Sequence, residues 1–335
     1  MVAGGDVGEG RTRAAVDPGP PPFARQSMRQ GCAQAMLEIG ERDPSVVAMG
    51  SDGYSIFTAF AEKFPGRFID VGIAEANLIG VAAGLARGGK RVFAGAIASF
   101  LLRRAYEQIR NDICDAELPV TLVGVGGGFS YGMLGATHHI IEDFALAAAM
   151  PAMSVFAPAD VHEARAALHA AAALPGPSYI RLGAREDPVL HEGSVVLRRG
   201  VPLLLRTGES AVVFATGICV HEALLAAAEL EREGIEITIA SVPWLEPLSE
   251  SAVAAIAASH RFVLTVEEHL SLGGLGRSVR DALAHRGDLR VTSLSVEKTT
   301  PATGTREELL SRFGIDSVAI ATNVRRFSPP LRRQP

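Results

Sequence analysis

The 335-residue sequence predicts an α/β protein with two parallel-sheet domains. Short apolar runs alternate with helical patterns along most of the chain, which is typical of parallel sheets whose strands are joined by helices. A segment at 187–208 that contains several Gly, Pro and Arg residues interrupts this alternation, and the alternation then starts again. The length suits about two domains of ~150 residues, and a hydrophobic content of 48% is enough for two cores.

The first predicted domain covers residues 26–186. Its strands are short apolar runs that end at Gly, Pro or polar residues, as buried strands do. We expect these strands at 46–49, 67–70, 91–95, 120–125, 154–156 and 179–181. We expect the helices between them to begin near Gln26 and near Glu75, and to cover 56–63, 99–114, 141–149 and 160–173.

The second predicted domain, at 209–325, is smaller and repeats the alternation. We expect its strands at 211–215, 236–241, 262–267 and 290–294, and its helices at 221–233, 249–258 and 277–284. Residues 1–25 are rich in Gly, Pro and Arg and lack the apolar stretch of a signal peptide. We expect them to form a disordered arm, and residues 326–335 to form a disordered tail. The segment at 187–208 is the predicted linker.

The composition argues against several classes of protein. A net charge of −5 and an aromatic content of 6% argue against a nucleic-acid partner. The sequence has no apolar run of about 18 residues and therefore no candidate membrane span. Cys32, Cys114 and Cys219 lie far apart and form no CxxC motif. This cysteine pattern predicts a reduced, cytoplasmic protein and gives no zinc site or other metal site.

Glu75 is the unusual residue of the first domain. It is the one carboxylate in an apolar, glycine-rich run, VGIAEANLIGVAAGLA at 71–86. An ionised carboxylate is costly in such surroundings unless it is paired or neutralised. Two interpretations follow. Glu75 is either an acid in the first turn of a helix, where the helix dipole stabilises it, or a buried acid that is held in place for chemistry.

A glycine-rich loop and two histidines follow the fourth predicted strand. The run GVGGG at 124–128 lacks the GxGxxG spacing of a nucleotide-binding turn, so we interpret it as the border of a site. Thr137, His138 and His139 lie at the end of this loop, and we expect Thr137 to cap the helix that follows. Ligands of α/β proteins bind at the carboxyl ends of strands. This position favours a functional role for His138, and also for Phe100, which directly follows another strand.

Three motifs, in this order, resemble the pyrimidine-binding domain of the transketolase family: VGIAEANLIGVAAGLA, AIASFLLRRAYEQIRND and GATHHIIEDFA. The later motifs SVPWLEPL and TVEEHLSLGGLG are similar to the C-terminal domain of that family. The resemblance covers about residues 27–325, and its motifs are specific in combination. It implies a thiamine-diphosphate pyrimidine-binding fold for the first domain and a transketolase C-terminal fold for the second.

The resemblance also implies thiamine diphosphate as the cofactor and a role for individual residues. It places Glu75 against N1′ of the aminopyrimidine and Phe100 in a stack on the pyrimidine ring. It makes His138 the residue that binds substrate oxygens and moves protons. The remaining implied contacts are Asp52 and Ile73 to the cofactor, and Ser55 and either Arg181 or Arg185 to the substrate.

A complete transketolase has a further N-terminal domain, which binds the diphosphate and Mg²⁺ through a Gly-Asp-Gly signature followed by an Asn. In this sequence Ser51 interrupts that signature, and Asn77, at a similar distance, belongs to the Glu75 helix. The resemblance therefore implies a split enzyme of which this chain is the C-terminal subunit. We expect a separate N-terminal subunit to ligate the Mg²⁺, and the assembly to be an α2β2 heterotetramer.

Two departures from the family pattern concern the substrate. Leu134 stands at or next to the place of an Asp that reads a donor hydroxyl, and the glycines at 126–128 replace a histidine that contacts phosphate. We therefore expect ketol transfer with a substrate other than an ordinary pentose phosphate. Three alternatives stay open: the β subunit of a 2-oxo acid dehydrogenase E1 component, a C–C ligase similar to deoxyxylulose-phosphate synthase, and a non-catalytic partner that only completes a neighbour's fold.

Overall fold

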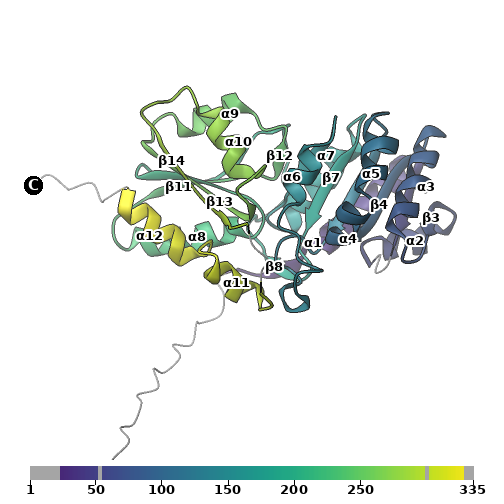
Figure 1. The fold of residues 1–335 in the computed structure, drawn as a ribbon, viewed down its shortest axis with the longest axis horizontal. Coiled ribbons are helices and arrows are strands. Elements are labelled where there is room, and N and C mark those ends of the chain that lie inside the picture. Colours follow the sequence, from purple (N-terminus) through teal and green to yellow (C-terminus); the bar gives the residue numbers. More distant parts are fainter. Residues whose placement is uncertain (1–22, 52–54, 299–301, 328–335) are drawn as a thin grey trace, which may run out of the picture.

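A computed structural model describes residues 23–51, 55–298 and 302–327. Two α/β domains lie side by side, the first in purple to teal and the second in green to yellow (Figure 1). Each domain is built on a sheet whose strands are mostly parallel, and helices pack against it. The predicted fold class is therefore confirmed.

The sheet of the first domain has the strand order β12-β6-β7-β5-β4-β2-β3. Its strands are parallel except β12, which pairs antiparallel with β6. Strands β2 and β5 are buried at every position, as expected for a parallel sheet that is covered on both faces. The bounds are β2 Val46–Gly50, β3 Phe68–Asp70, β4 Arg91–Ile97, β5 Val120–Val125, β6 Ser154–Phe156, β7 Ser178–Leu182 and β12 Trp244–Glu246.

The helices of the first domain follow the expected alternation with its strands. They are α1 Met28–Arg42, α2 Thr58–Lys63, α3 Glu75–Arg87, α4 Ala98–Arg104, α5 Tyr106–Gln108, α6 Asp143–Ala148 and α7 Val161–Ala172. Short 3-10 turns at Ser55–Phe57, Pro65–Arg67 and Gly132–Leu134, and a π-helical turn at Ile109–Cys114, complete the set.

The second domain has the strand order β14-β13-β10-β11-β9, in which only β9 is antiparallel to its neighbour. Its strands are β9 Leu203–Arg206, β10 Ala211–Ala215, β11 Ile237–Ser241, β13 Phe262–Leu270 and β14 Arg290–Val296. Its helices are α8 Cys219–Glu231, α9 Glu250–Ala257, α10 Leu275–Ala282, α11 Arg306–Arg312 and α12 Ser317–Phe327. A separate two-stranded sheet pairs β1 Arg25–Ser27 with β8 Glu186–Pro188.

Helix α1 illustrates how the sequence determines local packing. It begins at Met28 because the Ser27 hydroxyl accepts a hydrogen bond from the Arg29 backbone N–H at 3.3 Å. Gly31 allows α1 to lie directly against α7, since a Cβ at that position would be 2.3 Å from the Val161 carbonyl oxygen. The buried face of α1 consists of Met28, Gly31, Cys32, Ala35, Met36, Ile39 and Gly40.

The helix expected at 99–114 is not continuous. Helix α4 ends at Arg104, because Ala105 leaves the helical conformation at φ −106° and ψ 18°. The chain then continues through α5 into the π-helical turn, where Ile109, Ile113 and Cys114 are buried. A π turn shifts the register of side chains, and this shift lets buried residues follow the break. Apolar spacing alone predicts one helix here.

Other expectations about the elements were also wrong. Strand β12 comes from the second half of the chain, yet it joins the first sheet, and α11 and α12 were not predicted. The predicted linker contains β9 and most of β8. Residues 23–25 were expected in the arm, but Arg25 pairs with Pro188, and α12 extends to Phe327, into the expected tail. The rest of the arm and tail lies outside the described residues.

Candidate active site

The candidate residues gather at one edge of the first sheet. Glu75 follows β3, Phe100 follows β4, His138 lies in the loop after β5, and Arg185 follows β7. These strands are parallel neighbours in the order β7-β5-β4-β2-β3. The candidate residues therefore lie along the carboxyl edge of the sheet, where open α/β sheets bind ligands.

Glu75 is the first residue of α3, and its side chain is buried, with an exposed fraction of 3%. The Arg104 Nη1 atom donates to both carboxylate oxygens of Glu75, at 3.1 and 3.0 Å. The Ala74 N–H, just before the helix, donates to the Ser51 hydroxyl at 3.1 Å. Both of the interpretations drawn from the sequence apply to its position, because Glu75 lies in the first turn of a helix and is also a buried carboxylate.

Arg104 connects Glu75 to two aromatic groups. Its guanidinium lies over the Phe100 ring at 4.0 Å, and the Phe100 ring meets the His138 ring edge-to-face at 5.0 Å. Cation–π and edge-to-face contacts of this kind are favourable. The sequence alone did not single out Arg104, although its spacing of four residues from Phe100 places both on one face of α4.

The two adjacent histidines have different surroundings. His138 is half-buried, its Nδ1 lies 3.0 Å from the Thr137 hydroxyl, and its ring is 6.0 Å from the Tyr131 ring. His139 is buried, and its Nε2 bonds to the Gly132 carbonyl at 3.0 Å. Of the two, only His138 therefore faces Phe100. Thr137 does not cap the next helix as expected, because α6 begins after Glu142.

The two arginines considered for substrate binding also differ. Arg181 is buried and donates to the Ile140 carbonyl at 2.8 Å and to Asp143 at 2.9 Å. Burial raises the pKa of Asp143, and the charge of Arg181 opposes that shift. These contacts occupy the Arg181 guanidinium, so Arg181 has a structural role here. Arg185 is exposed and has no hydrogen bond or ion pair with any residue that the structure describes.

The other expected contacts are only partly visible. The Ile73 side chain is 73% exposed, immediately before the Glu75 helix. Ser55 begins a 3-10 turn after β2. Asp52 lies outside the described residues.

The second domain holds the loop that carries His138. The Glu268 carboxylate accepts the Phe129 N–H at 3.0 Å and receives two bonds from Arg306, at 2.8 and 2.7 Å. Burial disfavours the charged form of Arg306, but the charges of Glu268 and Asp187 outweigh it and raise the pKa of Arg306. The Phe129 ring stacks on Phe313 at 5.3 Å. Glu268 and Arg306 were not predicted, although two carboxylates in the apolar strand run TVEEHL indicate buried charges.

The described residues fit one half of a thiamine diphosphate site. Glu75 is a buried acid beside the Phe100 ring and the exposed Ile73 side chain, and this set suits an aminopyrimidine. Among the described residues, no group of three His, Cys, Asp or Glu side chains is arranged to hold a metal ion. A search of the same residues finds no helix that is both long enough and apolar enough to span a bilayer.

Two family models match the sequence. The transketolase pyrimidine-binding domain matches residues 24–186, and the transketolase C-terminal domain matches residues 200–320. The chain is also 34% identical over 304 residues to a putative transketolase C-terminal section from Methanocaldococcus jannaschii, in an alignment that covers 89% of this chain and 95% of the relative. The chain belongs to the transketolase family.

Two further relatives of this transketolase-family chain have a similar extent. It is 30% identical over 304 residues to one of the named subunits of an apulose-4-phosphate transketolase from Phocaeicola vulgatus, covering 89% of this chain and 96% of the relative. A solved structure described as a split gene transketolase in an inactive β4 tetramer is 35% identical, with a TM-score of 0.84, and the match covers 91% of this chain and 99% of that one.

Proposed function

We propose that this chain is the C-terminal subunit of a two-component, thiamine-diphosphate-dependent transketolase that transfers a two-carbon ketol unit. The observation that carries this proposal is the position of Glu75, a buried acid at the carboxyl edge of the pyrimidine-binding domain, fixed by Arg104 next to an aromatic ring. Relatives that this chain spans almost completely are named as a C-terminal section or as one subunit of a transketolase, which supports the two-component arrangement.

Glu75 would hold a proton at N1′ of the cofactor. Arg104 contributes a single nitrogen, which is shared between the two oxygens, so each carboxylate oxygen keeps the capacity to accept another hydrogen bond. Phe100 would stack on the pyrimidine, a contact of about 0.5–1.5 kcal/mol beyond its burial. Thiamine diphosphate, when bound, supplies the electron sink for breaking a carbon–carbon bond.

His138 and Arg185 would act on the substrate. His138 is half-buried next to Phe100, where its ring can exchange protons with hydroxyl or carbonyl oxygens. Arg185 offers a guanidinium that is unpaired among the described residues, further along the same edge and suited to an anionic end of the substrate. Ser55, Asp52 and Ile73 remain proposed contacts at the same edge.

A separate N-terminal subunit would supply the diphosphate and Mg²⁺ half of the site, in an α2β2 heterotetramer. Apolar side chains are exposed around the carboxyl edge, with fractions of 73% for Ile73, 57% for Met133 and 56% for Leu134. Exposed apolar groups next to a site are typical of surfaces that another protein covers. The same Leu134, where the family has a polar residue, supports a donor with fewer hydroxyl contacts than an ordinary pentose phosphate.

The test is reconstitution with the N-terminal subunit, followed by a screen of donors. We expect ketol transfer from a ketose or hydroxypyruvate, and a loss of at least about 1,000-fold in rate for Glu75→Gln, with assembly size unchanged by light scattering. Glu107→Gln, which removes an exposed acid on α5, is the matched control and should keep full activity.

The donor screen also separates the alternatives. Turnover of pyruvate or branched 2-oxo acids alone would favour the dehydrogenase β subunit. Condensation of pyruvate with an aldehyde would favour a ligase similar to deoxyxylulose-phosphate synthase. Assembly and catalysis that are unaffected by Glu75→Gln would favour a purely structural partner. Ordinary transketolase rates with xylulose 5-phosphate and ribose 5-phosphate would contradict the unusual substrate.

A further inference from the structure

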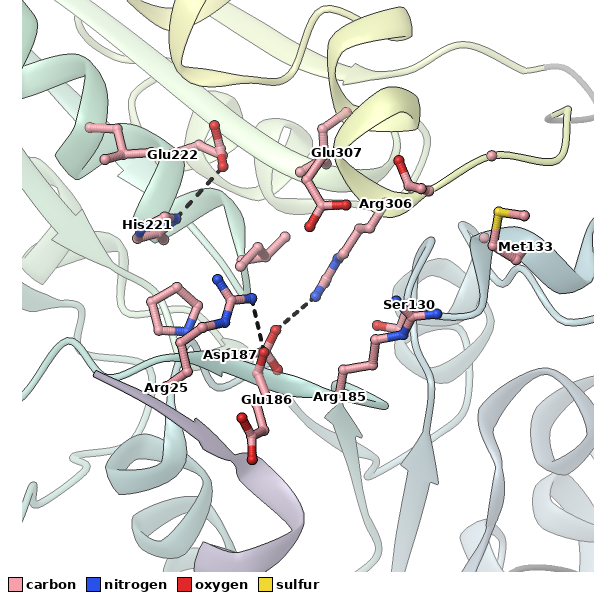
Figure 2. Close-up of a pocket in the computed structure, with 17 residues that line it drawn as sticks. Arg25, Ser130, Met133, Arg185, Glu186, Asp187, His221, Glu222, Arg306 and Glu307 are labelled. Carbon is pink, nitrogen blue, oxygen red and sulfur yellow. Dashed lines mark hydrogen bonds and ion pairs between the residues drawn. The ribbon is translucent and has the colours of Figure 1, made fainter. Parts of the chain in front are cut away.

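A cavity of about 230 Å³ lies between the two domains, next to Arg185 (Figure 2). The first domain lines it with Arg25, Ser130 and the Arg185–Pro188 segment, and the second domain lines it with His221 and Glu307 among others. The volume is below the range of about 300–1,000 Å³ that is typical of drug-sized ligands. The cavity is therefore of a size for a small metabolite.

Three buried polar atoms that line this cavity have no hydrogen-bond partner among the described residues. They are Ser130 Oγ, Asp187 Oδ2 and His221 Nε2. Ser130 and Asp187 have exposed fractions of only 5% and 3%. A buried polar atom without a partner costs about 1–3 kcal/mol. Three such atoms around a single cavity indicate a site for a ligand that can both donate and accept hydrogen bonds.

The charged side chains around the cavity leave one cation and one carboxylate without a partner. Arg306 is held by Asp187 at 3.0 Å and by Glu268, and Glu222 accepts the Ser317 N–H at 2.9 Å. Within the described residues, Arg185 and Glu307 have neither a hydrogen bond nor an ion pair. Figure 2 shows these two side chains on different sides of the cavity, one from each domain. A ligand that carries both charges would satisfy both.

The remaining lining is apolar. It consists of Met133, Pro188, Ile218, Leu225 and Leu310. A sugar phosphate does not suit this lining, because it offers no apolar group, and its double negative charge would lie near Asp187 and Glu307. A ligand that combines a cation, an anion and an apolar side chain does suit it.

We propose that this cavity binds a free α-amino acid with an apolar side chain. The carboxylate of the amino acid would bind Arg185 and Ser130, and its ammonium group would bind Glu307 and the unpaired oxygen of Asp187. Its side chain would pack on Ile218, Leu225 and Leu310. Because Ser130 and Met133 belong to the loop that carries His138, the bound amino acid would also contact that loop.

Isothermal titration calorimetry on the full chain tests this proposal. The probes are L-leucine and L-phenylalanine, and three comparison compounds each lack one feature or more: N-acetyl-L-leucine has no ammonium group, 3-methylbutylamine has no carboxylate, and inorganic phosphate has neither an ammonium group nor an apolar part. We expect saturable binding of at least one amino acid, and at least tenfold weaker binding of every comparison compound.

Variants locate the site. Arg185→Gln and Glu307→Gln should each weaken binding at least tenfold, and Leu225→Trp, which fills the cavity, should abolish it. Arg199→Gln and Glu250→Gln remove exposed charges of the same types outside the cavity and should change nothing. If Leu225→Trp fails to fold, as judged by circular dichroism, the two charge variants still decide the question.

Several results would overturn the proposal: no saturable binding of either amino acid, equal binding of N-acetyl-L-leucine, binding of phosphate alone, or amino-acid binding that neither charge variant weakens. The titration needs no second subunit, cofactor or turnover. Its failure would therefore leave the Glu75 test of the proposed function intact, and a failure of that test would leave this one intact.

Discussion

Arg104 donates from one nitrogen to both oxygens of the Glu75 carboxylate, at 3.1 and 3.0 Å. The Arg104 side chain is 51% exposed, whereas the Glu75 side chain is 3% exposed. A cation that faces solvent thus holds an acid that is buried in the protein. Loss of the arginine would leave the buried charge without its partner, which is far more costly than loss of a pair at the surface.

We therefore expect Arg104→Gln to lower the free energy of unfolding by about 1–3 kcal/mol and to slow the reconstituted enzyme. The neighbouring Arg103 pairs with Glu142, and both of those side chains are partly exposed, at 36% and 27%. Arg103→Gln is the matched control and should cost less than about 1 kcal/mol. Urea unfolding and initial rates measure both variants. Equal effects of the two substitutions would show that the Glu75 pair has no special weight.

Glu268→Gln should loosen the loop that carries His138. The substitution removes the charge that pairs with the buried Arg306, and it weakens the acceptor of the Phe129 N–H. Breaking a buried ion pair costs about 3–5 kcal/mol. We expect faster hydrogen exchange across residues 129–140, measured by mass spectrometry on the full chain. Glu297→Gln, at an exposed acid outside this network, should leave the exchange of the loop unchanged.

Two glycines in helices should respond to alanine in opposite directions. Gly80 in α3 is exposed and has no atom within 4 Å of an added Cβ, so Gly80→Ala should stabilise the chain by about 0.4–1 kcal/mol. Gly31→Ala would place its Cβ 2.3 Å from the Val161 carbonyl oxygen and should cost about 1–3 kcal/mol. Urea unfolding measures both. A stabilising Gly31→Ala would contradict the close packing of α1 on α7.

The stability of the chain should fall as the pH rises from about 5 to 8. Burial, helped by the charge of Asp160, raises the pKa of Glu163 from 4.5 to about 7. Burial opposes the charged form of His191, but the hydrogen bond with Asp160 and the charge of Glu163 outweigh it and raise its pKa. The folded chain therefore binds more protons than the unfolded chain in this range, so the free energy of unfolding decreases with pH.

Unfolding in urea at pH 5, 6, 7 and 8 tests this dependence. Each group contributes a slope of at most about 1.4 kcal/mol per pH unit. Glu163→Gln removes one of the two groups and should flatten the profile, whereas Glu62→Gln, at an exposed acid on α2, should not. A profile that rises between pH 5 and 8, or one that Glu163→Gln leaves unchanged, would contradict the assignment.

The sequence predicted those features that depend on local patterns. The alternation of apolar runs with helical patterns predicted both parallel sheets, and the glycine-rich apolar run around Glu75 indicated an unusual acid. Residues that meet only through tertiary contacts could not be found in this way. Arg104 lies 29 residues from Glu75, and Arg181 looked equivalent to Arg185 until its buried contacts with Asp143 appeared. His138 and His139 are adjacent, and only the fold determines which of them faces Phe100.

Strand β12 has a consequence for how the chain can be divided. The pyrimidine-binding family model ends at residue 186, but Trp244 and Glu246 pair with β6, and the Trp244 ring lies 4.5 Å from the Phe156 ring. A fragment that stops between the two matched segments would expose β6 as a bare strand edge, which invites aggregation. The boundary that is visible in the sequence is therefore not a place where the molecule can be cut, and the two halves form one folding unit.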